Sequence, residues 1–418
     1  MTAQSIPADH GRARAVDVIG SLATLLSLVV LVVLYSGAAY FRQSATEINL
    51  GRVVTNPVHP RYLYLAILIF TLFAVFQPNG ALRRKKIPGQ FLWACAIFAI
   101  FMTAQVFMQA QSDFFWFSYH LEFMVMIPCY IVLLGSASNP ELIFKVLRWI
   151  VVFESLFYGF LFVEPRAFPL FTPYFGRVSG MWGNPNVAAI FIAASVPLIA
   201  IGLKPSRRAF VYMITLLGVL ATLSRGGLVI WTVMFILSLF FRSRTATAAD
   251  RAERTLYLAG GGLAALVGTV LANINVMGWL ASVSTGKVTR LSTTRDFSTS
   301  ERLYVLKLGW SKFMENPIFG NGVGYTMRWD YASASTHNMF LLVLAEQGAI
   351  GFLILMFWIL SFLSFPGVSG IWAIGFFCSS GIFSHNMFEG EYAIIFALYF
   401  LGAYAEKDLE ARQALAAA

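Results

Sequence analysis

One long polar stretch and its apolar surroundings decide the fold of this chain. Residues 285–337 read TGKVTRLSTTRDFSTSERLYVLKLGWSKFMENPIFGNGVGYTMRWDYASASTH and form the longest interval without an apolar run of membrane length. Apolar runs of about 17–26 residues lie on both sides, which is the length a helix needs to cross a bilayer core of about 30 Å. The stretch is therefore predicted to be a large loop between membrane-spanning helices.

The composition leads to the same fold class. Of the 418 residues, 58% are hydrophobic and only 12% are charged, and the mean hydropathy is +0.71, so the chain is too apolar for a soluble globular protein. The alternating pattern of an outer-membrane barrel is absent. We predict an all-α polytopic membrane protein with about twelve transmembrane helices. The predicted spans are residues 16–41, 61–77, 90–111, 114–135, 142–163, 185–203, 208–223, 226–241, 255–280, 337–361, 367–384 and 391–404.

The cysteines and the net charge exclude other classes. Cys95, Cys129 and Cys378 all lie inside apolar runs and have no metal-ligand spacing, so they predict neither a disulfide framework nor a metal site. The net charge of +10 is interpreted as cytoplasmic anchoring charge and contact with anionic membrane lipids. No nucleic-acid partner is expected.

The distribution of basic residues predicts the orientation, because Lys and Arg in short loops favour the cytoplasm. With the N-terminus inside, every alternate connection is basic, and the first apolar run is an uncleaved span. The predicted organisation is a cytoplasmic N-terminus (1–15), nine spans (16–280), a large outer loop (281–336), three spans (337–404) and a cytoplasmic tail (405–418). The basic residues on the inner side are Arg83, Arg84, Lys85, Lys86, Lys145, Arg148, Lys204, Arg207, Arg208, Arg242, Arg244, Arg251, Arg254, Lys407 and Arg412.

This topology places the basic loop on the outer face, which long loops reach largely regardless of their charge. Three further polar strings share that face: residues 176–186, residues 223–227 and residues 384–391. A basic loop held there predicts an anionic partner, either lipid headgroups or a phosphate-bearing substrate.

Two arginines are the first candidates for binding that anion. Arg225 lies between two apolar runs with glycines beside it, so it is either an interfacial arginine that snorkels or a fixed cation whose guanidinium binds phosphate bidentately. Arg302 precedes the helically spaced Leu303, Leu306 and Trp310, a pattern that predicts an amphipathic helix on the outer membrane surface. Arg302 on this helix either contacts lipid headgroups or binds phosphate. The glycine-rich run 320–324 predicts a tight loop whose amides meet an anion.

The histidines at the outer boundary are candidates for proton transfer. His337 is predicted to open a helix, with Ser335 or Thr336 as the N-cap. The positive end of that helix disfavours protonation and leaves the imidazole able to accept a proton, and the alternative is a purely structural histidine. His385 repeats the string His-Asn-Met-Phe and either supports the same site or caps a helix.

Other polar residues and absent motifs complete the analysis. His120, Glu122 and Glu346 lie inside predicted spans, where they either line a cavity or bond between helices. The outer face has no Asp-x-Asp or His-rich cluster, no Walker loop and no dinucleotide fingerprint. We therefore expect arginines, with no metal and no cofactor, to handle any phosphate.

Four strings, in this order, resemble the superfamily of O-antigen ligases and O-antigen polymerases. They are Gly180-Met-Trp-Gly-Asn-Pro-Asn186, Thr222-Leu-Ser-Arg-Gly-Gly227, the segment from Arg302 to Gly322, and His337-Asn-Met-Phe-Leu-Leu-Val-Leu-Ala-Glu-Gln-Gly-Ala-Ile-Gly351. The resemblance implies a membrane glycosyltransferase of the GT-C type in the bacterial inner membrane, with its active site facing the periplasm. The implied donor is a glycan on undecaprenyl pyrophosphate, and the implied acceptor of a ligase is the lipid A-core.

The resemblance also assigns roles to residues. The essential arginines and histidine of the family carry over to Arg225, Arg302 and His337. In the implied reaction His337 takes the proton from an acceptor hydroxyl that attacks the anomeric carbon with inversion, and the arginines hold the pyrophosphate without a metal. The residues expected to contact substrate are Arg177, Asn184, Asn186, Asn338 and His385.

Two alternatives remain open at this stage. An O-antigen polymerase would share the donor and the topology, and we favour a ligase because a single large outer loop joins the His337 motif directly. A transporter of lipid-linked glycans is the alternative from a different class; it predicts polar, broken helices near the membrane midplane and internal repeats.

Overall fold

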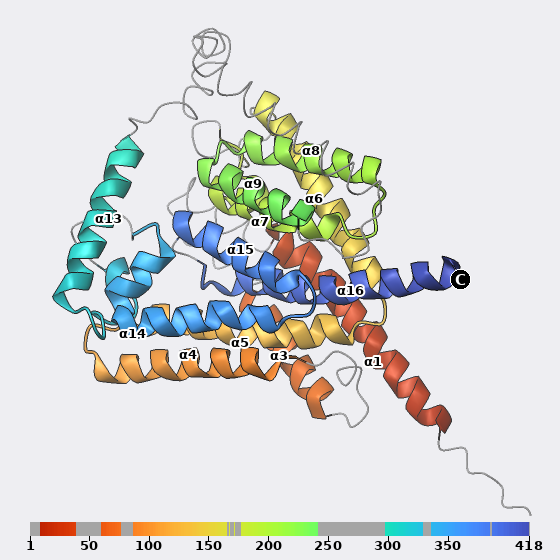
Figure 1. Ribbon diagram of the computed structural model, residues 1–418, viewed down its shortest axis with the longest axis horizontal. Coiled ribbons are helices and arrows are strands. Elements are labelled where there is room, and N and C mark those ends of the chain that lie inside the picture. The colour runs from red at the N-terminus through yellow and green to blue at the C-terminus, as the bar shows by residue number, and fades with distance from the viewer. Residues whose placement is uncertain are drawn as a thin grey trace, which may run out of the picture.

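The computed structural model describes residues 9–38, 60–76, 87–164, 167, 171, 177–240, 297–328, 336–384 and 387–417. Twelve α-helices and no β-strand occur among these residues (Figure 1). The helices are α1 (Asp9–Val30), α3 (Pro60–Phe76), α4 (Gly89–Met108), α5 (Phe114–Ser136), α6 (Pro140–Val163), α7 (Pro185–Ile199), α8 (Pro205–Ala221), α9 (Arg225–Phe240), α13 (Phe297–Glu315), α14 (Met339–Ser361), α15 (Ser369–Phe383) and α16 (Ala393–Ala417).

The prediction of an all-α fold is confirmed. Eleven of the predicted spans coincide with helices, and the span predicted at 255–280 lies outside the described residues. Among the residues that the structure describes, five helical segments are long and apolar enough to cross a membrane, and four shorter apolar helices accompany them. The last helix continues to Ala417, so the segment predicted as a tail after residue 404 is helical in the structure.

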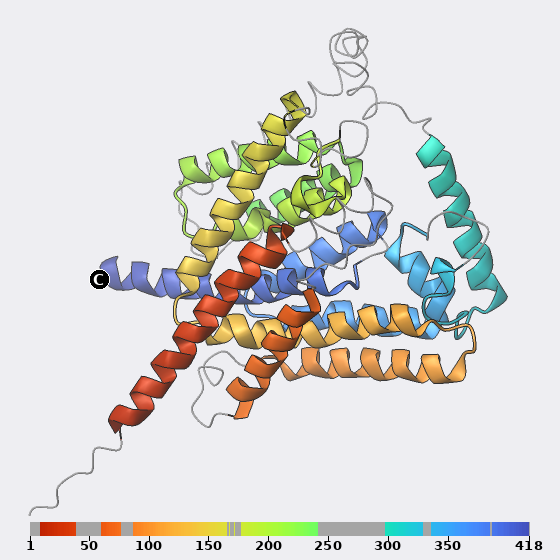
Figure 2. The same cartoon turned by 180° about the vertical axis from the view of Figure 1, so that it is seen from behind.

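Two helices form the centre of the bundle. Every residue of α7 from Ala188 to Ile199 is buried, as is α16 from Ala393 to Leu401. In Figures 1 and 2, α6, α7, α8 and α9 gather on one side, α4, α5 and α14 run beside one another on the other, and α15 and α16 lie between them. Outer helices expose large apolar side chains, as Leu65 and Ile69 do on α3, which is expected of surfaces that face lipid.

Helix α14 is broken at Gly348, and a loop fills the break. Gly348 has a φ of 67° and a ψ of −167°, a conformation that L side chains avoid. Ala349 N donates to Pro317 O at 2.8 Å, and Gly322 N donates to Glu346 O at 2.8 Å. The loop therefore satisfies backbone groups that the helix loses at its break. We call residues 316–322 the hook.

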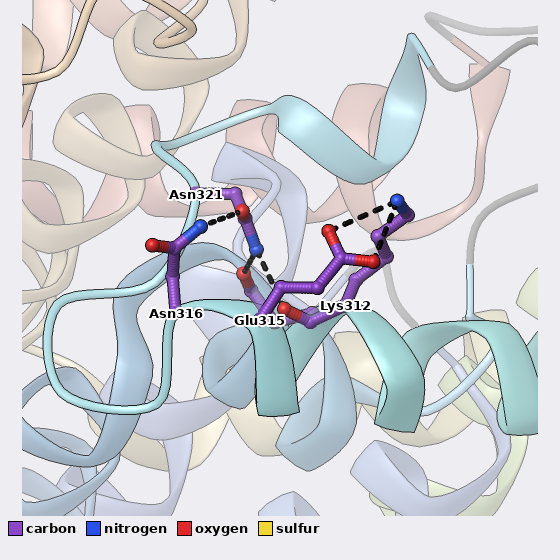
Figure 3. Close-up of polar contacts among 5 residues, drawn as sticks. Lys312, Glu315, Asn316 and Asn321 are labelled. Atoms are coloured by element: carbon purple, nitrogen blue, oxygen red, sulfur yellow. Dashed lines mark hydrogen bonds and ion pairs between the residues drawn. The ribbon is translucent and has the colours of Figure 1, made fainter.

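Side chains lock the hook in place. Asn321 Nδ2 donates to Lys312 O at 2.9 Å and to Ala345 O at 2.8 Å, while Asn316 Nδ2 donates to Asn321 Oδ1 at 2.6 Å (Figure 3). Gln105 Nε2 on α4 donates to Phe319 O at 2.7 Å. The hook thus ties the end of α13 to both α14 and α4.

The glycine-rich run contacts a carboxyl group of the chain itself, that of Glu346 on α14. Gly324 N and Thr326 N donate to the two carboxylate oxygens of Glu346 at 2.8 and 3.0 Å, and Thr326 Oγ1 donates at 2.6 Å. These amide groups are therefore already hydrogen-bonded within the chain, and Glu346 joins α14 to residues 324–326.

Helix α13 lies at one edge of the bundle, at a steep angle to α4 and α14 (Figure 1). It packs on α14 through buried Val305 and Gly309, whereas Leu303 and Trp310 are each 54% exposed. The predicted helix is present, and of its patterned apolar residues Leu303 and Trp310 are exposed while Leu306 is half-buried. Gly309 explains the contact, because a residue without a side chain lets the two backbones approach closely.

Candidate active site

Two helices, α7 and α9, begin at one recess, and the turn before α14 borders it. It contains about 600 Å³ of empty space, and its polar lining comes from the starts of α7 and α9, the turn before α14 and the end of α15. Apolar side chains such as Ile190 and Ile230 form its walls. The polar residues that line it are Asn184, Asn186, Ser224, His337 and Ser384.

A hydrogen-bond network joins the α7 start to the α9 start. Asn186 Oδ1 accepts from Arg177 Nη2 and from Ser224 Oγ, both at 2.9 Å. Arg177 Nε also donates to Thr222 O at 3.2 Å, and Asn184 Oδ1 caps α7 by accepting from Asn186 N at 2.9 Å. Residues about 40 positions apart in the sequence therefore form one rigid unit.

The start of α9 positions Arg225. Leu223 adopts a φ of 52°, which is rare for a branched residue, and Ser224 Oγ accepts from Gly227 N at 3.1 Å. A β-carbon on Gly227 would lie 2.3 Å from Ala189 Cβ, so this glycine permits the close contact of α7 and α9. Arg225 is half-buried between Ser224 and Gly226, both of which line the recess.

His337 lies before α14 and not within it, which corrects the predicted helix start. The helix begins at Met339, and its N-cap is Asn338, whose Oδ1 accepts from Leu341 N at 2.9 Å. Thr336, predicted as a cap, instead donates from Oγ1 to Asn338 O. His337 has a φ of 51°, and such strain in a non-glycine residue clusters at functional sites.

The electrostatics of the recess favour an anion. The N-termini of α7 and α9 bring partial positive charge to the recess, and Phe383 and Ser384 bring the smaller, opposite charge of the α15 C-terminus. Arg225, between two lining residues, adds a full positive charge beside it. No acidic side chain is among the described residues that line the recess. Helix N-termini arranged in this way form a ready site for phosphate groups.

The structure places some predicted residues beside the recess and leaves others undetermined. Asn338 Nδ2 reaches Ile382 O at 3.5 Å and so links α14 to the end of α15. Arg302 lies on α13, seven residues before Gly309 and hence on the helix face that packs on α14. The side chain of Arg302 and the whole of His385 lie outside the described residues.

Sequence reasoning missed two contributors to this region. Ser224 was not among the predicted site residues, although a serine immediately before the first residue of a helix is an N-cap signal. Gln105 on α4 gave no signal, because its partner Phe319 is more than 200 residues away. Within the described part of the chain, no group of three or more His, Cys, Asp or Glu residues is arranged to hold a metal ion.

The fold and the recess define a multi-pass, all-α membrane protein with a polar recess at one end of its bundle. Residues 209–356, about a third of the chain, match the family model described as O-antigen ligase. The resemblance to the O-antigen ligase superfamily, whose members are glycosyltransferase-like enzymes, is thereby confirmed over this region. The match includes Arg225, Arg302 and His337. None of the curated proteins compared with the chain matches it.

Proposed function

We propose that the recess is the active site of an O-antigen ligase. In this proposal the enzyme transfers a glycan from undecaprenyl pyrophosphate to a sugar hydroxyl of lipid A-core. The observation that carries the proposal is the meeting of the α7 and α9 N-termini and His337 at one recess, with Arg225 between two of its lining residues and no acid among the described residues that line it. The α9 start and His337 lie in the region that matches the family.

The pyrophosphate of the donor would be bound by Arg225 and Arg302. The guanidinium fork matches phosphate oxygens bidentately, and fixed cations stabilise the negative charge that grows as the pyrophosphate leaves. Arg177 already bonds to Asn186 and Thr222, which supports a role in holding the α7 and α9 starts together. Its direct contact with the anion stays a prediction, as do the substrate contacts of Asn184, Asn186, Asn338 and His385.

His337 would act as the general base. It would accept the proton of the acceptor hydroxyl while the oxygen attacks the anomeric carbon, and a single displacement would invert that carbon. The chain supports this role by holding His337 at the rim of the recess in an unusual backbone conformation. No metal takes part in the proposed reaction.

The proposed location is the bacterial inner membrane, with the recess facing the periplasm. Basic residues at the opposite end of the helices, such as Lys145 and Lys204, support this orientation because positive charge favours the cytoplasmic side. The apolar walls of the recess suit donor and acceptor molecules that both carry lipid tails.

The proposal is tested by measuring glycan transfer by the purified protein in detergent or nanodiscs. The donor is a glycan on undecaprenyl pyrophosphate, with lipid A-core as acceptor, and parallel reactions omit the acceptor, contain EDTA or use His337→Ala. We expect ladders on lipid A-core that persist in EDTA and disappear with His337→Ala. Glycans that lengthen on the donor lipid without acceptor would instead identify a polymerase, and unchanged transfer by His337→Ala would remove the histidine from the mechanism.

A further inference from the structure

A second and larger recess lies at the opposite end of α7. It is formed by the first turns of α6 and α8, by the residues after α7 and by Ala405 on α16, and it contains about 1420 Å³ of empty space. Helix α7 separates it from the first recess by 15 residues, a length of about 22 Å. The two recesses are therefore distinct sites.

Basic side chains dominate the lining of this second recess. Lys145, Arg148 and Arg207 contribute three positive charges, and Glu141 is the single acid among its described lining residues. The resulting field attracts an anion.

Arg148 is held in a fixed orientation within the recess. Its Nε donates to Ile199 O at 2.7 Å, and its Nη2 donates to Ile201 O at 2.8 Å. A guanidinium has five N–H donors, and these two carbonyls cannot use them all. The remaining N–H donors of Arg148 are held in a fixed plane, and this planar arrangement matches the oxygens of a phosphate group.

An exposed apolar surface lies beside the basic residues of this recess. Trp149 is 66% exposed and Phe210 is 57% exposed, and both line the recess. Exposed aromatic side chains next to basic ones are typical of the membrane–water boundary, where the rings meet the upper acyl chains and the cations meet the headgroups.

We propose that this second recess binds the headgroup of an anionic glycerophospholipid. The phosphodiester lies against Lys145, Arg148 and Arg207, and the acyl chains extend along Trp149 and Phe210. Basic pockets between transmembrane helices on the cytoplasmic side recognise such headgroups. The proposal rests on the geometry of this recess alone and does not depend on the function proposed for the first one.

The experiment uses the full-length protein in nanodiscs that contain a photoreactive phosphatidylglycerol, and crosslinks are mapped by mass spectrometry. We expect crosslinks concentrated in residues 141–149 and 201–211, and weaker labelling with an otherwise identical phosphatidylcholine probe. Equal labelling by both probes, or label spread evenly over the apolar surface, would overturn the proposal.

Charge variants supply the affinity measurement. Lys145→Gln and Arg207→Gln each remove one exposed cation, and each is expected to weaken phosphatidylglycerol retention in native mass spectrometry by roughly fivefold. Lys307→Gln, which removes an exposed cation on α13, is the matched control and should leave the crosslinks in residues 141–149 and 201–211 unchanged. Loss of the lipid on addition of millimolar inorganic phosphate would identify a free-phosphate site and overturn the assignment to lipid, whereas retention supports it.

Discussion

At the residue scale, the candidate site depends on a few side chains that hold other groups in place. Asn186 accepts two hydrogen bonds on one oxygen, from Arg177 and Ser224, and so joins the starts of α7 and α9. It also lines the recess. Substitutions of Asn186 can therefore separate its contribution to folding from its effect on binding of the proposed pyrophosphate donor.

Asn186→Asp keeps the accepting oxygen but adds a negative charge to the recess. We expect the thermal midpoint to stay close to that of the wild type and the KM for the pyrophosphate donor to rise about tenfold, which corresponds to about 1.4 kcal/mol of charge repulsion. Asn186→Ala removes the acceptor and should cost about 1–3 kcal/mol of stability. Thermal unfolding and transfer kinetics measure the two effects, and an aspartate variant with unchanged KM would place the donor elsewhere.

Glu389 makes the stability depend on pH. Burial, followed by the charge of Glu391, raises the pKa of Glu389 well above its usual value. Because the folded state then binds the proton more tightly than the unfolded state, stability is highest at low pH and falls as pH rises from about 4.3 towards the folded pKa. Glu389→Gln should raise the thermal midpoint more at pH 8 than at pH 5. An equal effect at both pH values would contradict this assignment.

At the element scale, the contact between α13 and the His337 turn depends on Gly309. A β-carbon there would lie 2.9 Å from Thr336 Cγ2 and 3.0 Å from Leu341 Cδ2. The leucine methyl group can move, but Thr336 is β-branched and its hydroxyl is bonded to Asn338 O, so its methyl group is fixed. An added side chain therefore pushes α13 away from the turn that holds His337.

Gly309→Ala should therefore reduce transfer by about tenfold or more, because small displacements of reacting groups are costly. Thr336→Ser removes the obstructing methyl group and keeps the hydroxyl, so the double variant should recover most of the activity. Gly159→Ala is the matched control, since an added β-carbon there meets nothing within 4 Å. Failure of Thr336→Ser to rescue would show that the α13 contact does not position the site.

At the scale of the whole molecule, the two recesses lie at opposite ends of the bundle, and the orientation in the membrane decides what each can meet. In a background where Cys95, Cys129 and Cys378 are replaced by alanine, cysteines at exposed Gln111 and Ser206 report on the two ends. A membrane-impermeant maleimide should label Gln111→Cys in intact spheroplasts and Ser206→Cys only after permeabilisation. The reverse pattern would contradict the N-inside topology.

The sequence by itself determined the all-α membrane fold, most helix positions and the motifs of the family, because these follow from local properties. Apolar run length predicts a helix, and glycine and asparagine mark helix ends. The start of α14 was misplaced by two residues because Ser335, Thr336 and Asn338 are all plausible caps, and only packing chooses between them.

Only the tertiary structure decided which polar groups face one another. The hydrogen bond from Ser224 to Asn186, the hydrogen bond from Gly324 to Glu346, and the hook in the break at Gly348 all join segments distant in sequence. The physical reason is that a buried donor takes whichever acceptor the packed helices bring within about 3 Å, and no pattern within one segment encodes that partner.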